Sequence, residues 1–140
     1  MILTHVLTFM MITGATFSWD GTNWSELGNM KTPRENHACV EKDGIIFAMG
    51  GEGAYKLKSV EKLNLATGVW SEGPELPYEV GHVGAVNIHG DIFVVGGEGS
   101  GGKIIKLVDN AWVPVSDFGF DGIGLLSNPP IVTPDQVMCQ

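Results

Sequence analysis

The sequence repeats itself at a spacing of about 46 residues, and this repeat limits the folds open to the chain more than any other feature. The segment GIIFAMGGEG, which begins at Gly44, returns 46 residues later as GDIFVVGGEG at Gly90. The tripeptide Trp-Ser-Glu occurs at Trp24 and again, 46 residues later, at Trp70, and a further tryptophan follows at Trp112. Landmarks that recur in one order at nearly one spacing indicate a fold built from repeated supersecondary units.

Each repeat unit has the pattern of four short strands. In the first full unit the predicted strands are 36–41, 45–49, 59–65 and 69–71. The dipeptide Asp43-Gly44 is typical of a hairpin turn, and 45–49 is a continuous apolar run of the kind found in buried strands. The third strand of the second unit is expected to be shorter. No helix is predicted, because glycine opposes helix and the chain has 20 glycines, about twice the usual share of roughly 7%.

A unit of about 45 residues with four strands is typical of one blade of a β-propeller, and its landmark residues resemble the kelch repeat. The residues at the motif's positions are Pro33-Arg34, Gly50-Gly51, Leu63 and Trp70 in the first unit, and Gly96-Gly97 and Trp112 in the second. The second unit departs from the motif at Glu79-Val80, where kelch repeats have Pro-Arg.

The resemblance covers roughly residues 19–118 and implies an all-β fold, a partial kelch-type β-propeller. It predicts two complete four-stranded blades, at about 36–71 and 81–115, with partial blades at both ends. Residues 119–140, which contain three prolines between 129 and 134, are predicted to form a further strand or an extended tail, because proline cannot donate to a strand ladder.

The first eighteen residues differ in character from the rest and are expected to form a signal peptide. They contain an apolar run without acids, lysine or arginine, followed by small residues, and the run is too short to span a bilayer. The expected location is therefore extracellular, with Asn23 in the Asn-Trp-Ser sequon as a glycosylation acceptor. The alternative is a buried strand of a blade in a cytoplasmic protein.

Charge and cysteine content exclude several classes of protein. The formal charge of -8, from 8 basic and 16 acidic residues, leaves no basic face for nucleic acid. Cys39 and Cys139 are too few for a disulfide scaffold or a four-cysteine zinc site, and the sequence leaves open whether they form a bridge. No segment after residue 18 has the length and hydropathy of a membrane span.

The residues favour neither a metal site nor an enzyme. His37 and His82, 45 residues apart, are interpreted as equivalent positions on neighbouring blades, where Cys39 could join them near the central axis. We expect structural roles for all three, and no metal or cofactor. A copper site like that of galactose oxidase, which shares the kelch family, would need paired tyrosines and histidines, whereas Tyr55 and Tyr78 lie in predicted loops. No catalytic residue is predicted.

The kelch resemblance, which extends to actin-associated scaffolds, favours a non-catalytic protein–protein interaction module, either a secreted protein or a fragment of a larger propeller. Loops at the ends of the blades would bind a protein partner that the sequence does not identify. The alternatives are a fragment of a galactose-oxidase-like enzyme and a truncated chain without independent function. Self-association could complete the propeller, because an incomplete ring exposes apolar blade faces. The predicted binding residues are Arg34, Tyr55, Lys56, Lys58 and Tyr78.

Overall fold

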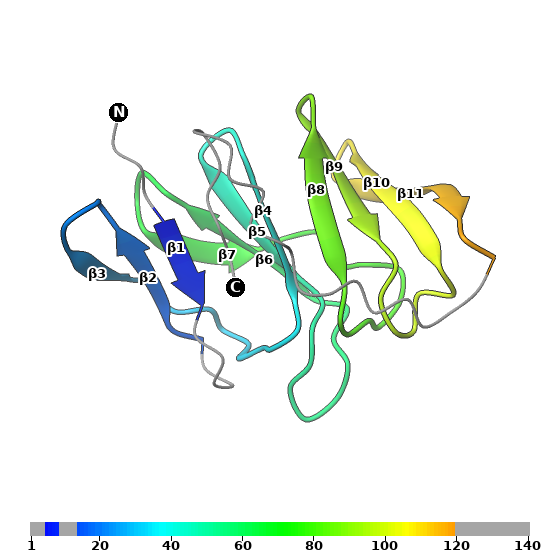
Figure 1. Ribbon diagram of the computed structural model, residues 1–140, viewed down its shortest axis with the longest axis horizontal. Coiled ribbons are helices and arrows are strands. Elements are labelled where there is room, and N and C mark those ends of the chain that lie inside the picture. The colour runs from blue at the N-terminus through cyan, green and yellow to red at the C-terminus, as the bar shows by residue number, and fades with distance from the viewer. Residues whose placement is uncertain (1–4, 9–13, 120–140) are drawn as a thin grey trace.

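The computed structural model describes residues 5–8 and 14–119, and in these residues all regular structure is β-strand (Figure 1). The strands form three antiparallel sheets that follow one another along the chain. The first sheet contains β1 (His5–Thr8), β2 (Thr16–Trp19) and β3 (Trp24–Leu27). The second contains β4 (Ala38–Lys42), β5 (Ile45–Met49), β6 (Val60–Asn64) and β7 (Val69–Glu72). The third contains β8 (Gly84–Ile88), β9 (Asp91–Val95), β10 (Lys103–Val108) and β11 (Ala111–Asp117).

Within each sheet, strands adjacent in the sequence pair with one another, which is the blade predicted from the repeat. The predicted bounds agree closely with β4 to β7. The third strand of the second unit, expected to be shorter, is in fact longer, with six residues in β10 against five in β6. Among the described residues, no helix is long and apolar enough to cross a membrane.

The hairpin turns account for the sharp reversals between strands. Asp43 and Gly44, between β4 and β5, have φ angles of 52° and 76°, as a type I′ turn requires at both central residues. His89 and Gly90 repeat this turn between β8 and β9, with φ angles of 52° and 87°. A tight turn of this type matches the right-handed twist of the strands that it joins, so the two hairpins have the same shape.

Two apolar clusters join the three sheets side by side, with the second sheet in the middle (Figure 1). The larger cluster lies between the second and third sheets, where Met49 and Ile105 are both 0% exposed. The smaller one contains Cys39, Ile46 and Leu63, with Leu27 of the first sheet packed against it. The sheets thus stack face to face, as blades of a propeller do.

The structural register corrects one equivalence that the sequence suggested. The isolated bridges Glu35–Glu52 and Gly81–Glu98 match each other at a spacing of 46 residues. The same spacing makes Asn36 the counterpart of His82, and both have positive φ angles, 51° and 50°. The predicted equivalence of His37 with His82 is therefore wrong by one residue, and the counterpart of His37 is Val83.

The N-terminal blade is more complete than predicted. The repeat predicts that 19–27 supply only the last strand of a preceding, partial blade, whereas β1, β2 and β3 form a three-stranded sheet. The segment that we expect to be a signal peptide contains all of β1 and all but the last residue of β2, so cleavage after Ser18 would remove β1 and most of β2. Residues 120–140, and with them Cys139 and most of the predicted C-terminal strand or tail, lie outside the described residues.

Candidate functional site

The β5–β6 loop, residues 50–59, is the most prominent loop of the described chain and projects from the lower side of the molecule in Figure 1. Tyr55, at its tip, has 83% of its surface exposed. Backbone bridges pair Glu52 with Lys56 within the loop, and Leu57 with Val80 of the segment that leads to the third sheet. The tyrosine is therefore presented on a loop that backbone hydrogen bonds hold in place.

Arg34, one of the residues predicted to face a partner, is buried instead, with 0% of its side chain exposed. Its Nη1 donates to the carbonyl oxygens of Gly50, at 2.7 Å, and Ser59, at 3.0 Å, which are the two ends of the β5–β6 loop. Its Nη2 donates to Glu61 Oε1 at 2.9 Å. The prediction of Arg34 as a partner contact is wrong, because its hydrogen bonds fix the loop from inside.

Glu61 completes this buried network. Its carboxylate accepts the backbone N–H of Lys31 at 2.7 Å and that of the following residue at 3.0 Å. Burial lowers the pKa of the Arg34 guanidinium, and the hydrogen bond and charge of Glu61 oppose that shift. A buried charge needs such a partner, because removal from water disfavours the ionised form.

The two predicted binding lysines are both in ion pairs that link the loop to its surroundings. Lys56 Nζ lies 3.2 Å from Glu98 Oε2, in the loop after β9, and Lys58 Nζ lies 2.8 Å from Glu75 Oε2, in the segment between the second and third sheets. Side chains of all four residues remain partly exposed. These lysines are therefore accessible, but a partner would have to compete for them.

Tyr78 was predicted to be a loop-surface residue, and the structure instead packs it against the larger apolar cluster. Its hydroxyl is buried and has no hydrogen-bond partner, and burial raises the pKa of Tyr78 to about 12. Lys103 Nζ lies 5.5 Å from the centre of its ring. The hydroxyl is thus not available to a partner. Asn23, the predicted glycosylation acceptor, is exposed in the turn between β2 and β3.

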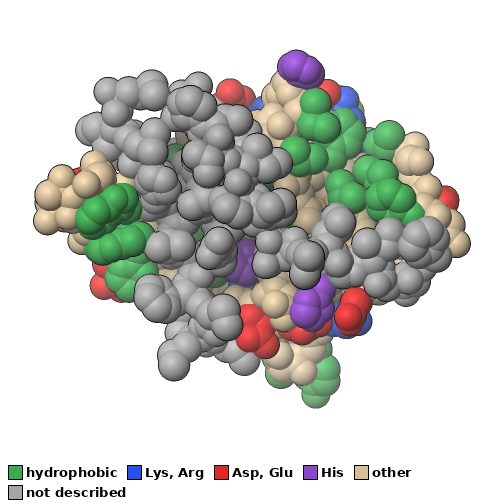
Figure 2. Space-filling view, in the orientation of Figure 1, with side chains coloured by type: hydrophobic (Ala, Val, Ile, Leu, Met, Phe, Trp, Pro, Cys, Tyr) green, Lys and Arg blue, Asp and Glu red, His purple; other side chains and the backbone are tan. Residues whose placement is uncertain are grey.

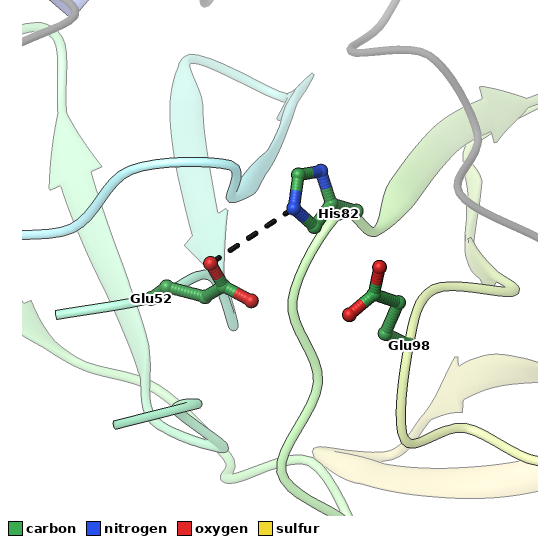
Figure 3. Close-up of side chains that lie close together, drawn as sticks. All are labelled: Glu52, His82 and Glu98. Carbon is green, nitrogen blue, oxygen red and sulfur yellow. Dashed lines mark ion pairs between the residues drawn. The ribbon is translucent and has the colours of Figure 1, made fainter. Parts of the chain in front are cut away.

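A small group of titratable side chains lies beside the β5–β6 loop, and the sequence did not predict it. Glu52, His82 and Glu98 come from three different loops and point toward one another (Figure 3). Each offers one ligand atom, and these atoms all lie within 4.8 Å of one another. His82 Nε2 lies 3.9 Å from Glu52 Oε2. Figure 2 shows purple histidine and red acidic atoms together at the lower centre of the surface.

This group replaces the arrangement that the sequence suggested. Among the described residues, His37 and Cys39 do not join His82 in a group with metal-ligand spacing. Burial, with a smaller effect from the charge of Arg34, lowers the pKa of His37 to about 4. A spacing of 46 residues, which relates Glu52 to Glu98, was the signal that could have found the new group.

The sequence matches known proteins over part of its length. The Kelch motif matches residues 33–77. The mouse Kelch-like protein 35 is 31% identical over 87 residues, which cover 61% of this chain and 15% of the relative. Beta-scruin of Limulus polyphemus is 31% identical over 98 residues, which cover 64% of this chain and 11% of the relative. The chain thus spans less than a fifth of the length of these curated relatives.

A solved structure, that of YjhT, has the same fold. It aligns with a TM-score of 0.68 at 14% identity, over 75% of this chain and 46% of that chain. The antiparallel four-stranded sheets, the double glycines and the matched motif therefore agree: residues 33–77 contain a Kelch motif, and the chain has the fold of a segment of a kelch-type β-propeller.

Proposed function

We propose that this chain is a non-catalytic protein–protein interaction module, and that its partner binds the end of the propeller segment from which the β5–β6 loop projects. The observation that carries this proposal is Tyr55, which is 83% exposed on a loop whose two ends are both bonded to the buried Arg34. Tyrosine is enriched among the residues that dominate binding energy. A loop fixed in advance loses less conformational entropy on binding than a free one.

The residues around Tyr55 support a protein surface as the ligand. Lys56 and Lys58 follow Tyr55 in the same loop, and their ion pairs with Glu98 and Glu75 give the base of the loop partly exposed charges of both signs. An aromatic centre with a polar, exposed rim is the usual composition of an interface. The relatives that match this sequence, Kelch-like protein 35 and beta-scruin, are several times longer than this chain, and the identity of the partner has to be found by experiment.

The experiment is affinity capture from an extract of the cells that make the protein, followed by a binding measurement with the purified candidate. The bait is compared with its Tyr55→Ser variant and with Val69→Ser, a matched control. Val69 is 60% exposed but lies at the turn between β6 and β7, at the other end of that blade. We expect a partner whose affinity falls at least about tenfold with Tyr55→Ser and is unchanged with Val69→Ser.

Capture that is indifferent to Tyr55, or equally reduced by both variants, would contradict the proposal. Two further measurements address the alternatives. A cooperative thermal melt of the purified chain is expected if it is a module, and its absence would favour a truncated chain without independent function. Metal analysis of the same protein tests the galactose-oxidase-like alternative, since stoichiometric copper would argue for an enzyme.

Secretion of the chain is a separate proposal that rests on the sequence of residues 1–18 alone. It is tested by expression in a secreting eukaryotic cell and N-terminal sequencing of the product. Removal of the segment, with a glycan on Asn23, would support secretion. Recovery of the intact chain inside the cell would support the alternative, in which His5–Thr8 and Thr16–Trp19 are permanent strands of the first sheet.

A further inference from the structure

The junction between the second and third sheets shows how two blades of this chain fit together. Side chains of a strand alternate between the two faces of its sheet. On the face of the second sheet that points toward the third, Phe47, Met49 and Val60 belong to the larger apolar cluster. Ile92 and Ile105 of the third sheet pack against them. We call the surface with Phe47, Met49 and Val60 the downstream face of the second sheet. We call the surface with Ile92 and Ile105 the upstream face of the third sheet.

The third sheet has a downstream face of the same design, but the described chain provides no sheet to cover it. The positions that correspond to Val40, Phe47, Met49 and Val60 in the second sheet are Val86, Phe93, Val95 and Ile104. Phe47, Met49 and Val60 are buried, whereas their counterparts in the third sheet are partly exposed, and Val40 and Val86 are both partly exposed. Figure 2 shows apolar side chains gathered on the surface over β8 to β11.

On the first sheet it is the opposite, upstream face that no other sheet of the described chain covers. Leu27 points toward the second sheet, so alternation places Trp24 on the other face, together with its cross-strand partner Trp19. The rings of these two tryptophans lie 5.1 Å apart, and Trp24 is 50% exposed. The register pairs Trp19–Trp24, Leu63–Trp70 and Leu107–Trp112 are equivalent. The latter two pairs pack on apolar clusters.

The hydrogen bonds of the indole N–H groups also indicate that the first sheet lacks a preceding sheet. Trp70 Nε1 donates to the carbonyl oxygen of Gly28 at 2.6 Å, and Trp112 Nε1 donates to that of Pro74 at 2.8 Å. Each acceptor lies just after the last strand of the preceding sheet. The equivalent indole, Trp24 Nε1, donates to no carbonyl in the described part of the chain, and the preceding sheet that would supply one is absent there.

We propose that a second copy of this chain covers both ends, so that two copies form one closed ring. The upstream face of the first sheet in each copy, with Trp19 and Trp24, would pack on the downstream face of the third sheet in the other, with Phe93 and Ile104. Two copies of three sheets give six, within the range of about 4–8 blades in closed propellers, and three copies would exceed it. A head-to-tail contact that occurs twice closes such a ring.

The size of a related fold agrees with this number. The alignment with YjhT covers 46% of that chain, so two such segments have about the extent of one full kelch propeller. The two uncovered faces are also complementary in kind, because each corresponds by register to one side of the junction that the chain already contains. Because one chain carries both complementary faces, a second copy of it can cover each of them.

The first test is the mass of the purified 140-residue chain in solution, measured by sedimentation velocity and light scattering at micromolar concentration. We expect a particle of twice the chain mass of 15.0 kDa. A monomer with a cooperative melt would overturn the proposal, as would a series of open oligomers that grows with concentration. A monomer would show that any missing blades come from a longer chain or another protein.

Two variants locate the interface. Trp24→Glu alters the upstream face and Phe93→Glu the downstream face, and each is expected to raise the dimer dissociation constant about thirtyfold or more, as for a central interface residue. Tyr55→Glu is the matched control, because it places the same charge on an exposed loop tip outside both faces, and it should leave the mass unchanged. Circular dichroism spectra check that each variant keeps its strands.

A mixture of the two variants distinguishes head-to-tail packing from other dimers. In a mixed pair the intact upstream face of one variant meets the intact downstream face of the other, and the two substituted faces meet at the second contact. An equimolar mixture should therefore associate through one native contact, more tightly than either variant alone. If only one of the two substitutions weakens the dimer, or the mixture associates no more tightly than either variant alone, the head-to-tail ring is wrong. Should either variant unfold, the mass of the unaltered chain still decides, together with a shift of tryptophan emission to shorter wavelength as its concentration rises.

Discussion

The second and third sheets follow the same backbone path, yet the same pair of interior positions holds two charged residues in one and two apolar residues in the other. In the second sheet the buried pair is an ion pair, Arg34 with Glu61, whose side chains are 0% and 5% exposed. In the third sheet the residues at the equivalent positions are Val80 and Ile105, both 0% exposed. Buried ion pairs lose much of their attraction to desolvation, so an apolar pair of suitable volume can serve equally well.

The difference extends to the backbone around the pair. Glu61 accepts the N–H group of Lys31 at 2.7 Å, and the residue 46 positions later is Pro77, which has no N–H to satisfy. Ile105, which cannot accept a hydrogen bond, therefore leaves no N–H unpaired at the position of Lys31. The second N–H that Glu61 accepts, that of Thr32, has Tyr78 as its counterpart, which keeps its N–H. The comparison teaches that the blade has lost one of the two donors along with the acceptor that satisfied them.

Breaking the ion pair should have the largest effect of the substitutions that test this comparison. Glu61→Ala leaves Arg34 as an uncompensated buried charge, and Arg34→Ala leaves Glu61 in the same condition. Each substitution is expected to lower the free energy of unfolding by about 3–5 kcal/mol. Val80→Ala in the other blade removes only apolar volume and should cost less. Urea denaturation measures all three, and equal losses would contradict the comparison.

Exchanging the pair rather than breaking it should have a smaller effect. The double variant Arg34→Val with Glu61→Ile copies the other blade and is expected to be more stable than either single alanine variant. It should remain below the unaltered chain, because the Lys31 N–H loses its acceptor. Additivity of the two single losses in the double variant would show that the two positions do not act as a pair.

The tryptophans test a feature that the two blades share. Trp70→Ala and Trp112→Ala should each lower the unfolding free energy by about 3 kcal/mol, the lower end of the range for large buried side chains, since both indoles are partly exposed. The corresponding phenylalanine variants lose mainly the N–H bond to the preceding sheet and should cost about 1 kcal/mol. An unchanged melting midpoint for Trp70→Ala would contradict its structural role.

His37 should make the stability of the second blade depend on pH, whereas its counterpart Val83 in the third blade cannot titrate. Burial lowers the pKa of His37 from 6.5 to about 4, so between these values the unfolded chain binds a proton that the folded chain does not. Stability should therefore be complete above about pH 6.5 and fall as the pH decreases toward 4, by about 3 kcal/mol from this residue. His37→Val should flatten this acid slope, and an unaltered slope would contradict the assignment.

The smallest effect on stability is expected from an exposed ion pair near the buried one. Lys31 Nζ lies 2.8 Å from Glu72 Oε1, and both side chains are more than three-quarters exposed. Solvent and salt screen such a pair, so Lys31→Ala should leave the denaturation midpoint unchanged within error. A loss that approaches that of Glu61→Ala would show that exposure does not decide the value of an ion pair in this fold.

The repeat predicted the fold from sequence because its landmarks are backbone requirements. Gly50, Gly51, Gly96 and Gly97 all have positive φ angles, a conformation that glycine adopts most readily. The equivalence of His37 with His82 failed because it matched identical letters. The feature that the structure repeats is a positive φ, which asparagine at 36 and histidine at 82 both tolerate.

The binding site was predicted less well, because the sequence does not show directly which charges are buried. Arg34 was predicted to bind a partner from a loop, although the repeat held a contrary signal, since its counterpart is Val80 and that of Glu61 is Ile105. An apolar residue at an equivalent position predicts a buried one. The group of Glu52, His82 and Glu98 depends on contacts between neighbouring blades, which no pattern within a single repeat contains.

The middle position of the second sheet also determines how the molecule should open. A chain of stacked units is held by contacts between nearest neighbours, as in a one-dimensional array. The second sheet is bonded on both sides, through Trp70 to Gly28 and through the Asn87 side chain to the carbonyl of Glu41 at 2.9 Å. In a single copy of the chain its central amides should therefore exchange with deuterium most slowly, and local unfolding should begin at the first and third sheets and move inward, whereas a closed ring of two copies would protect those two sheets as well.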